Sequence, residues 1–139
     1  MIKADTFKRG FLVGLGTTWE LTKIVLPIYF IVTFLKFTPI MDTLARWLSP
    51  AMQLVGLPGE AAIALVLGNL LNLYAALGAI TPLGLSSKEM TIIASMLLIS
   101  HNLLMESAIS RAAGVSGVGM AVFRLTLSIV TGLFLNIVL

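Results

Sequence analysis

The chain has no cysteine and few charged residues. Of its 139 residues none is Cys and 11% are charged, whereas soluble domains carry about 25% charged residues. The absence of cysteine excludes disulfide bonds, thiolate metal sites and thiol catalysis. No dinucleotide-binding loop, Walker lysine or Ser–His–Asp grouping occurs either. We therefore expect neither enzyme activity nor a cofactor.

Basic residues are also too dispersed to indicate a nucleic-acid partner. The nine Lys and Arg residues are spread along the chain and form no basic run. No spacing of His, Asp and Glu matches a metal-binding motif, so we expect no metal site. On a continuous helix His101 lies about 140° away from Glu106, so we expect the two side chains to lie apart and not to share a metal from the same face.

Apolar residues dominate the sequence. They make up 58% of it, and the mean hydropathy is +1.05. This composition predicts an all-α integral membrane protein with several spans of about 20 residues. The predicted elements are an amphipathic lead-in helix over residues 1–16, a span over 17–37, an interfacial helix over 39–56, a hairpin or span over 60–80, and spans over 89–110 and 115–139.

The apolar segment over residues 60–80 allows two interpretations. Its middle contains Gly68, Asn69 and Asn72, and both Gly and Asn favour turns. It is either a single span with a polar stripe or a re-entrant hairpin of two short helices. Half-helices of the second kind build transporter sites, because their ends offer dipoles and free backbone groups to a ligand.

Polar side chains recur on one face of the helix predicted over 89–110. At spacings of 4, 7 and 4 they are Thr91, Ser95, Asn102 and Glu106. Polar groups inside a membrane span are costly and carry a functional hypothesis by default, so this face is a candidate solute or ion pathway. Alternatively these groups hold helices together, with Glu106 paired to Arg111 or Arg124.

Two consecutive stretches resemble the gate family, also called nucleoside-recognition domain proteins. They are GLPGEAAIALVLGNLLNLYAALGAI, which begins at Gly56, and LSSKEMTIIASMLLISHNLLMES, which begins at Leu85. The string GLPGEA is the most specific match. The family includes spore maturation proteins A and B and the gate modules of ferrous-iron transporter B, and concentrative nucleoside transporters are distant relatives. The resemblance identifies residues 17–139 as a gate-type transmembrane domain.

The resemblance implies the order of one transporter repeat, namely an interfacial helix, a re-entrant hairpin and two further helices. It therefore favours the hairpin over residues 60–80. The polar residues that these transporters place in a broken helix map onto Asn102, Glu106 and Ser107. Asn69 and Asn72 occupy the tip, where the nucleoside transporters have a carboxylate. This departure and the missing cysteine of the iron modules argue against a ribose site and against iron.

Transporters of this kind contain two inverted repeats, whereas this chain contains one. The resemblance thus implies an antiparallel homodimer, or a heterodimer with a similar small gate protein, in a bacterial cell (inner) membrane. The implied function is a half-transporter or channel that moves a nucleoside-like solute or an ion at the subunit junction. Its implied site consists of Asn69, Asn72, Ser95, Asn102, Glu106 and Ser107. The alternative is a non-transporting membrane assembly subunit of the spore-maturation type.

Overall fold

The computed structural model describes residues 4–139, and over this range it contains helices and no strand. The helices are α1 (Ala4–Lys36), α2 (Pro39–Leu54), α3 (Ala61–Leu70), α4 (Leu73–Ile80), the short 3-10 helix η1 (Thr81–Leu83), α5 (Ser87–Ser100), α6 (Leu103–Ala112) and α7 (Gly117–Val138). The predicted all-α fold class is confirmed. Residues 1–3, which begin the predicted lead-in helix, lie outside the described residues.

Three helical stretches are long and apolar enough to cross a membrane. They are Asp5–Lys36, Ser87–Ala112 and Gly117–Val138. Large apolar side chains cover their outer surfaces, for example Trp19, Phe30, Phe134 and Ile137. Such extensive apolar exposure is unusual for a soluble protein, whereas lipid tails would cover it in a membrane.

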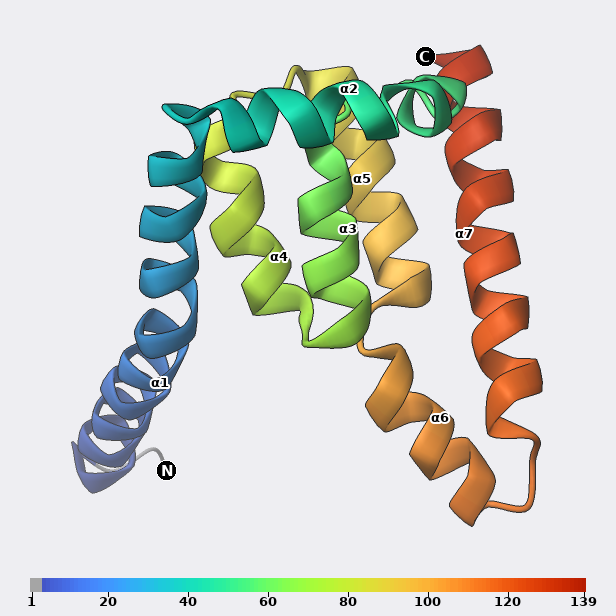
Figure 1. Cartoon of the computed structure of the whole chain (residues 1–139). Helices are drawn as coiled ribbons and strands as arrows, with labels where there is room; N and C mark the ends of the chain where they lie inside the picture. Colours follow the sequence, from blue (N-terminus) through green and yellow to red (C-terminus); the bar gives the residue numbers. More distant parts are fainter. Residues whose placement is uncertain (1–3) are drawn as a thin grey trace.

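The first two helices meet at a sharp corner. α1 is continuous, so residues 1–16 and 17–37, which the sequence predicts as two elements, share one helix as far as they are described. α2 then lies across one end of the other helices (Figure 1). This placement is the geometry expected of an interfacial helix, with Trp47 on its exposed side.

Residues 60–80 form a helical hairpin rather than one long helix. α3 and α4 lie side by side and antiparallel (Figure 1). α3 contacts α2, and α4 packs on α1. The turn between them follows from Asn72, whose backbone is extended and whose side-chain oxygen accepts the Ala75 N–H at 2.9 Å. This is the N-cap arrangement that starts a new helix.

Small residues allow the hairpin to pack closely. The buried positions of its two arms are mostly Ala and Gly, namely Ala61, Ala62, Ala64, Gly68, Ala75, Ala76, Gly78 and Ala79. Without a hydrophobic driving force between helices in lipid, close backbone approach of this kind is what holds membrane helices together. Larger side chains, including Val32 of α1 and Ile92, Ile93 and Leu97 of α5, fill the space around the hairpin.

The last part of the chain is a broken helix followed by a long straight one. α5 begins with a capping box in which the Ser86 hydroxyl accepts the Glu89 N–H at 3.3 Å and the Glu89 carboxylate accepts the Ser86 N–H at 2.7 Å. The span predicted over 89–110 is interrupted after Ser100, and α6 continues at an angle to α5 (Figure 1). α7 returns alongside both.

The contact between α1 and α4 depends on Gly78. A Cβ atom at this position would lie 2.7 Å from the backbone carbonyl oxygen of Val25. We therefore expect Gly78→Ala to destabilise the protein by about 1–3 kcal/mol, because the two helices must move apart. Thermal unfolding in detergent micelles measures this as a lower midpoint.

Gly14→Ala is the matched control, since no atom lies within 4 Å of a Cβ built there. It should leave the midpoint unchanged or raise it, because Ala favours helix over Gly by about 1 kcal/mol. Equal midpoints for both variants would contradict the close packing of α4 on α1.

Candidate functional site

The helix break between α5 and α6 is formed by His101 and Asn102. The backbone of His101 is extended, and Asn102 has φ 54° and ψ 41°. Asn102 is the only non-glycine with positive φ among residues 4–139. Asn tolerates this left-handed conformation better than most residues, because its short polar side chain forms local hydrogen bonds. The break frees backbone groups at the end of α5 and at the start of α6.

One of these freed groups binds the tip of the hairpin. The Asn102 N–H donates to the carbonyl oxygen of Gly68 at 2.8 Å. Gly68 is buried, and a Cβ at this position would overlap the Leu97 side chain. The glycine therefore permits the close approach, and the hydrogen bond joins the two interrupted helical segments of the chain.

A polar cluster of Asn69, Ser100 and Ser128 lies beside this junction. The Ser100 hydroxyl is 2.9 Å from the Asn69 Oδ1 atom and 3.2 Å from the Ser128 hydroxyl. Both hydroxyls also lie within 3.0 Å of the Met96 carbonyl oxygen. Each hydroxyl has a single hydrogen, so these contacts compete for two donors. Ser100 and Ser128 are fully buried, and they connect α3, α5 and α7.

An ion pair holds α6 against α7 on the other side of the break. The Arg124 guanidinium donates from Nε to the Ile99 carbonyl oxygen at 2.7 Å, and from Nη1 to the Glu106 carboxylate. The Arg124 side chain is only 14% exposed, whereas that of Glu106 is 40% exposed. Of the two cations considered as partners of Glu106, the structure selects Arg124. The Glu106 carboxylate therefore remains partly accessible from outside the protein.

The expectation that His101 and Glu106 lie apart is wrong. The His101 Nε2 atom is 3.9 Å from a Glu106 carboxylate oxygen. The 140° separation assumed a continuous helix, and the break at Asn102 removes that assumption. The other ring nitrogen, Nδ1, is 2.8 Å from the Leu97 carbonyl oxygen. His101 therefore lies next to the Glu106–Arg124 ion pair, beside the polar cluster.

Three of the six predicted site residues lie together, and the other three are not part of this group. Asn69, Asn102 and Glu106 lie at the junction of the hairpin tip and the helix break. Asn72 is at the tip, but its side-chain oxygen caps α4. The predicted polar face with Ser95 does not continue past the break, because α6 has a different direction from α5.

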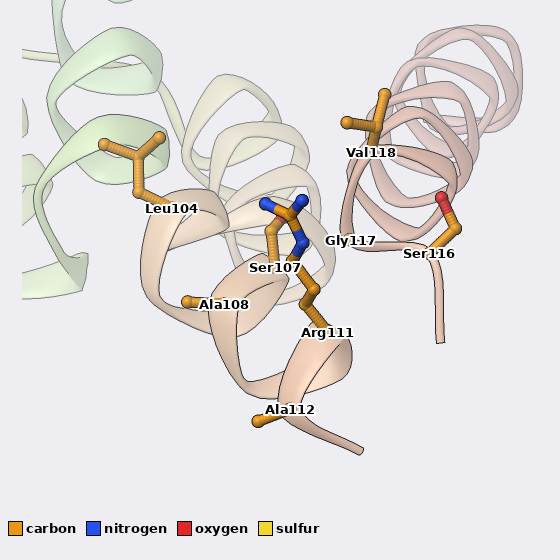
Figure 2. Close-up of a pocket in the computed structure, with 8 residues that line it drawn as sticks. All are labelled: Leu104, Ser107, Ala108, Arg111, Ala112, Ser116, Gly117 and Val118. Atoms are coloured by element: carbon orange, nitrogen blue, oxygen red, sulfur yellow. The ribbon is translucent and has the colours of Figure 1, made fainter. Parts of the chain in front are cut away.

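Ser107 lies farther along α6, on the side that meets α7. Its carbonyl oxygen would be 2.5 Å from a Cβ built at Gly117. It lines a separate pocket between these two helices (Figure 2). Ser107 therefore does not share a contact with Asn69 or Asn102.

Ser100 and Gly68 were not predicted as site residues, although Gly68 was named as a residue that favours a turn. Ser100, His101 and Asn102 form three consecutive polar residues inside an apolar run, and a continuous helix would point them in three directions. That pattern could have indicated the break.

Among residues 4–139 no group of three or more His, Asp or Glu side chains could hold a metal ion.

The Arg124–Glu106 pair should be thermodynamically coupled. Arg124→Gln leaves the Glu106 carboxylate and the Ile99 carbonyl without their charged partner, at an expected cost of about 1–3 kcal/mol in unfolding free energy. The double variant Arg124→Gln/Glu106→Gln should recover part of this loss, since it no longer leaves an unpaired charge. Thermal or denaturant unfolding of the four proteins measures the coupling. Strictly additive losses of unfolding free energy would contradict the coupling. Arg46→Gln, at an exposed position of α2, is the control and should leave the unfolding free energy unchanged.

Comparison with known proteins places the chain in a family. The Gate family, described as nucleoside recognition, matches residues 18–121. The chain is also 47% identical over 133 residues to a Bacillus subtilis (strain 168) protein named "Uncharacterized membrane protein YvoD". The match covers 95% of this chain and 42% of that relative, so the chain spans about two fifths of the relative's length. No solved structure matches. The chain is therefore a membrane protein that belongs to the Gate family of nucleoside-recognition domains.

Proposed function

We propose that the chain is one half of a transporter or channel-like protein for a small polar solute in a bacterial cell membrane. The observation that carries this proposal is the junction of two interrupted helical segments, joined by the Asn102–Gly68 hydrogen bond. Irregular backbone within a membrane is tolerated where it is buried in protein or lines a cavity. Broken helices that meet in this way supply the dipole ends and backbone groups that bind solutes in transporters.

The chemistry of the junction favours a neutral polar solute. The available groups are the partly exposed amides of Asn69 and Asn102, which both donate and accept hydrogen bonds. The buried Ser100 hydroxyl lies 2.9 Å from the Asn69 Oδ1 atom and positions that amide. The charges of Glu106 and Arg124 neutralise each other. A nucleoside, with its base edge and hydroxyl groups, fits this set, and the family description points to the same class.

One chain supplies only part of the proposed site. Asn69, Asn102 and Glu106 are only partly buried, and large apolar side chains dominate the exposed surface of the spans. Polar groups facing lipid are costly, so a second unit should cover them. The relative YvoD is more than twice as long as the matched stretch, which leaves room for a second unit of this size. For this chain we propose an antiparallel second copy or a similar small gate protein.

Solute binding is testable with side-chain variants at the junction. Asn102→Gly removes the amide, while glycine adopts the left-handed conformation without strain. The wild type should be stabilised against thermal unfolding by uridine or adenosine, by about 2.7 kcal/mol at a concentration 100 times the dissociation constant. Asn102→Gly and Ser100→Ala should lose this shift, and both should lose uptake of the same radiolabelled nucleoside into proteoliposomes.

Thr91→Ala is the matched control for Ser100→Ala. Its hydroxyl lies on the same helix but is exposed and bonded only to the Ser87 carbonyl oxygen, at 2.8 Å. This variant should bind and transport like the wild type. If neither nucleosides nor alkali-metal cations stabilise the wild type, and the variants only lower its stability, the junction is structural. That outcome would favour a membrane assembly subunit.

A further inference from the structure

A second site lies at the end of the molecule opposite α2. A cavity of about 600 Å³ lies between α6 and the start of α7 (Figures 1 and 2). Its lining combines polar with apolar side chains. The lining residues are Leu104, Ser107, Ala108, Arg111, Ala112, Ser116, Gly117 and Val118.

Arg111 supplies a positive charge that the protein does not neutralise. Glu106, five residues before it on α6, is engaged by Arg124. Within residues 4–139 no carboxylate lies within 4.0 Å of the Arg111 guanidinium. In Figure 2 the guanidinium extends beside Ser107, over the space between α6 and α7. A planar guanidinium offers five donors in a fork that matches the oxygens of a phosphate group.

Two hydroxyl groups accompany this charge. The Ser116 hydroxyl accepts the Gly119 N–H at 3.1 Å, so its own hydrogen is free to donate. The Ser107 hydroxyl forms no hydrogen bond within the described part of the chain and lies on the same wall as Arg111 (Figure 2). A cation and two hydroxyl donors around one cavity indicate an anionic ligand with several oxygen acceptors.

The remaining walls are apolar. The apolar lining residues include Leu104 and Ala108 of α6 and Val118 of α7. Both helices belong to stretches that can cross a membrane, so the cavity opens where their ends would meet lipid headgroups. The start of α1, which carries Lys8 and Arg9, lies at this same end (Figure 1). Basic residues at a membrane surface attract anionic lipids.

We propose that this cavity binds a phosphate group, held by Arg111, Ser107 and Ser116. The amphipathic lining fits the phosphate of an anionic lipid whose acyl chain follows Leu104 and Val118. A free phosphate-bearing solute shares the same chemistry. The proposal does not depend on the solute junction at Asn102, so each can fail without the other.

Lipid retention measured by native mass spectrometry tests the proposal. The full chain in detergent is titrated with phosphatidylglycerol and, separately, with phosphatidylcholine. The wild type should retain phosphatidylglycerol preferentially, and Arg111→Gln should weaken its binding by roughly tenfold or more, as expected for loss of a charge-assisted hydrogen bond. Arg111→Lys, which keeps the charge but loses the fork, should fall between the two.

Arg9→Gln is the matched control, because it removes an exposed guanidinium from the same end of the molecule. It should weaken phosphatidylglycerol binding much less than Arg111→Gln does, because Arg9 contributes only a general surface attraction. Equal weakening by Arg9→Gln and Arg111→Gln would overturn the proposal, since the attraction would then be a general surface effect. Unchanged binding by Arg111→Gln would overturn it as well.

A parallel titration with inorganic phosphate, read by thermal unfolding, distinguishes the source of the phosphate. Stabilisation of the wild type but not of Arg111→Gln, without lipid retention, assigns the cavity to a soluble phosphate compound. Lipid retention without an effect of inorganic phosphate assigns it to a lipid. Both results support phosphate binding, whereas the absence of both contradicts it.

Discussion

The hydrogen bond from the Asn102 N–H to the Gly68 carbonyl oxygen connects the two places where the chain stops being helical inside its apolar region. A membrane offers no water to satisfy a freed backbone group, and each unsatisfied group costs several kcal/mol. A hairpin tip and a broken helix are therefore difficult to maintain separately. Placed together, each supplies a partner to the other, and the arrangement of α3, α5 and α6 follows from this pairing.

Side-chain size sets the conditions for that pairing. Ala and Gly on the buried faces of α3 and α4 bring the hairpin arms together, and Gly68 lets the tip reach the break. Ser100 and Ser128 then tie the tip to α5 and α7 through hydroxyl groups that fit between closely packed helices. Arg124 of α7 also donates hydrogen bonds to the Ile99 carbonyl oxygen of α5 and to the Glu106 carboxylate of α6. The polar groups of the site thus also hold the helices in place.

The sequence allowed the helices to be predicted better than their interruptions. Long apolar runs locate spans directly, and the three stretches that are long and apolar enough to cross a membrane each overlap one of the predicted spans. Composition left the hairpin and the single span open, because Asn69 and Asn72 fit both a turn and the polar stripe of a single span. The break at Asn102 was not predicted from the residues, since its left-handed conformation is stabilised by a contact with Gly68, 34 positions earlier in the chain. The proximity of His101 to Glu106 follows from the same long-range contact.

The most direct test of this account asks whether α3 and α4 enter and leave the membrane on one side. Because the chain has no cysteine, a Gln53→Cys/Ser87→Cys protein carries only two thiols, both at exposed positions that flank the hairpin. Sealed vesicles are treated with a membrane-impermeant thiol reagent, and labels per molecule are counted by intact-mass spectrometry. A Lys8→Cys/Gln53→Cys protein, with its thiols at opposite ends, should take one label in every molecule. For the Gln53→Cys/Ser87→Cys protein, the hairpin predicts molecules with two labels or none, even if both orientations coexist. One label per molecule of this protein would show a single span and contradict the account.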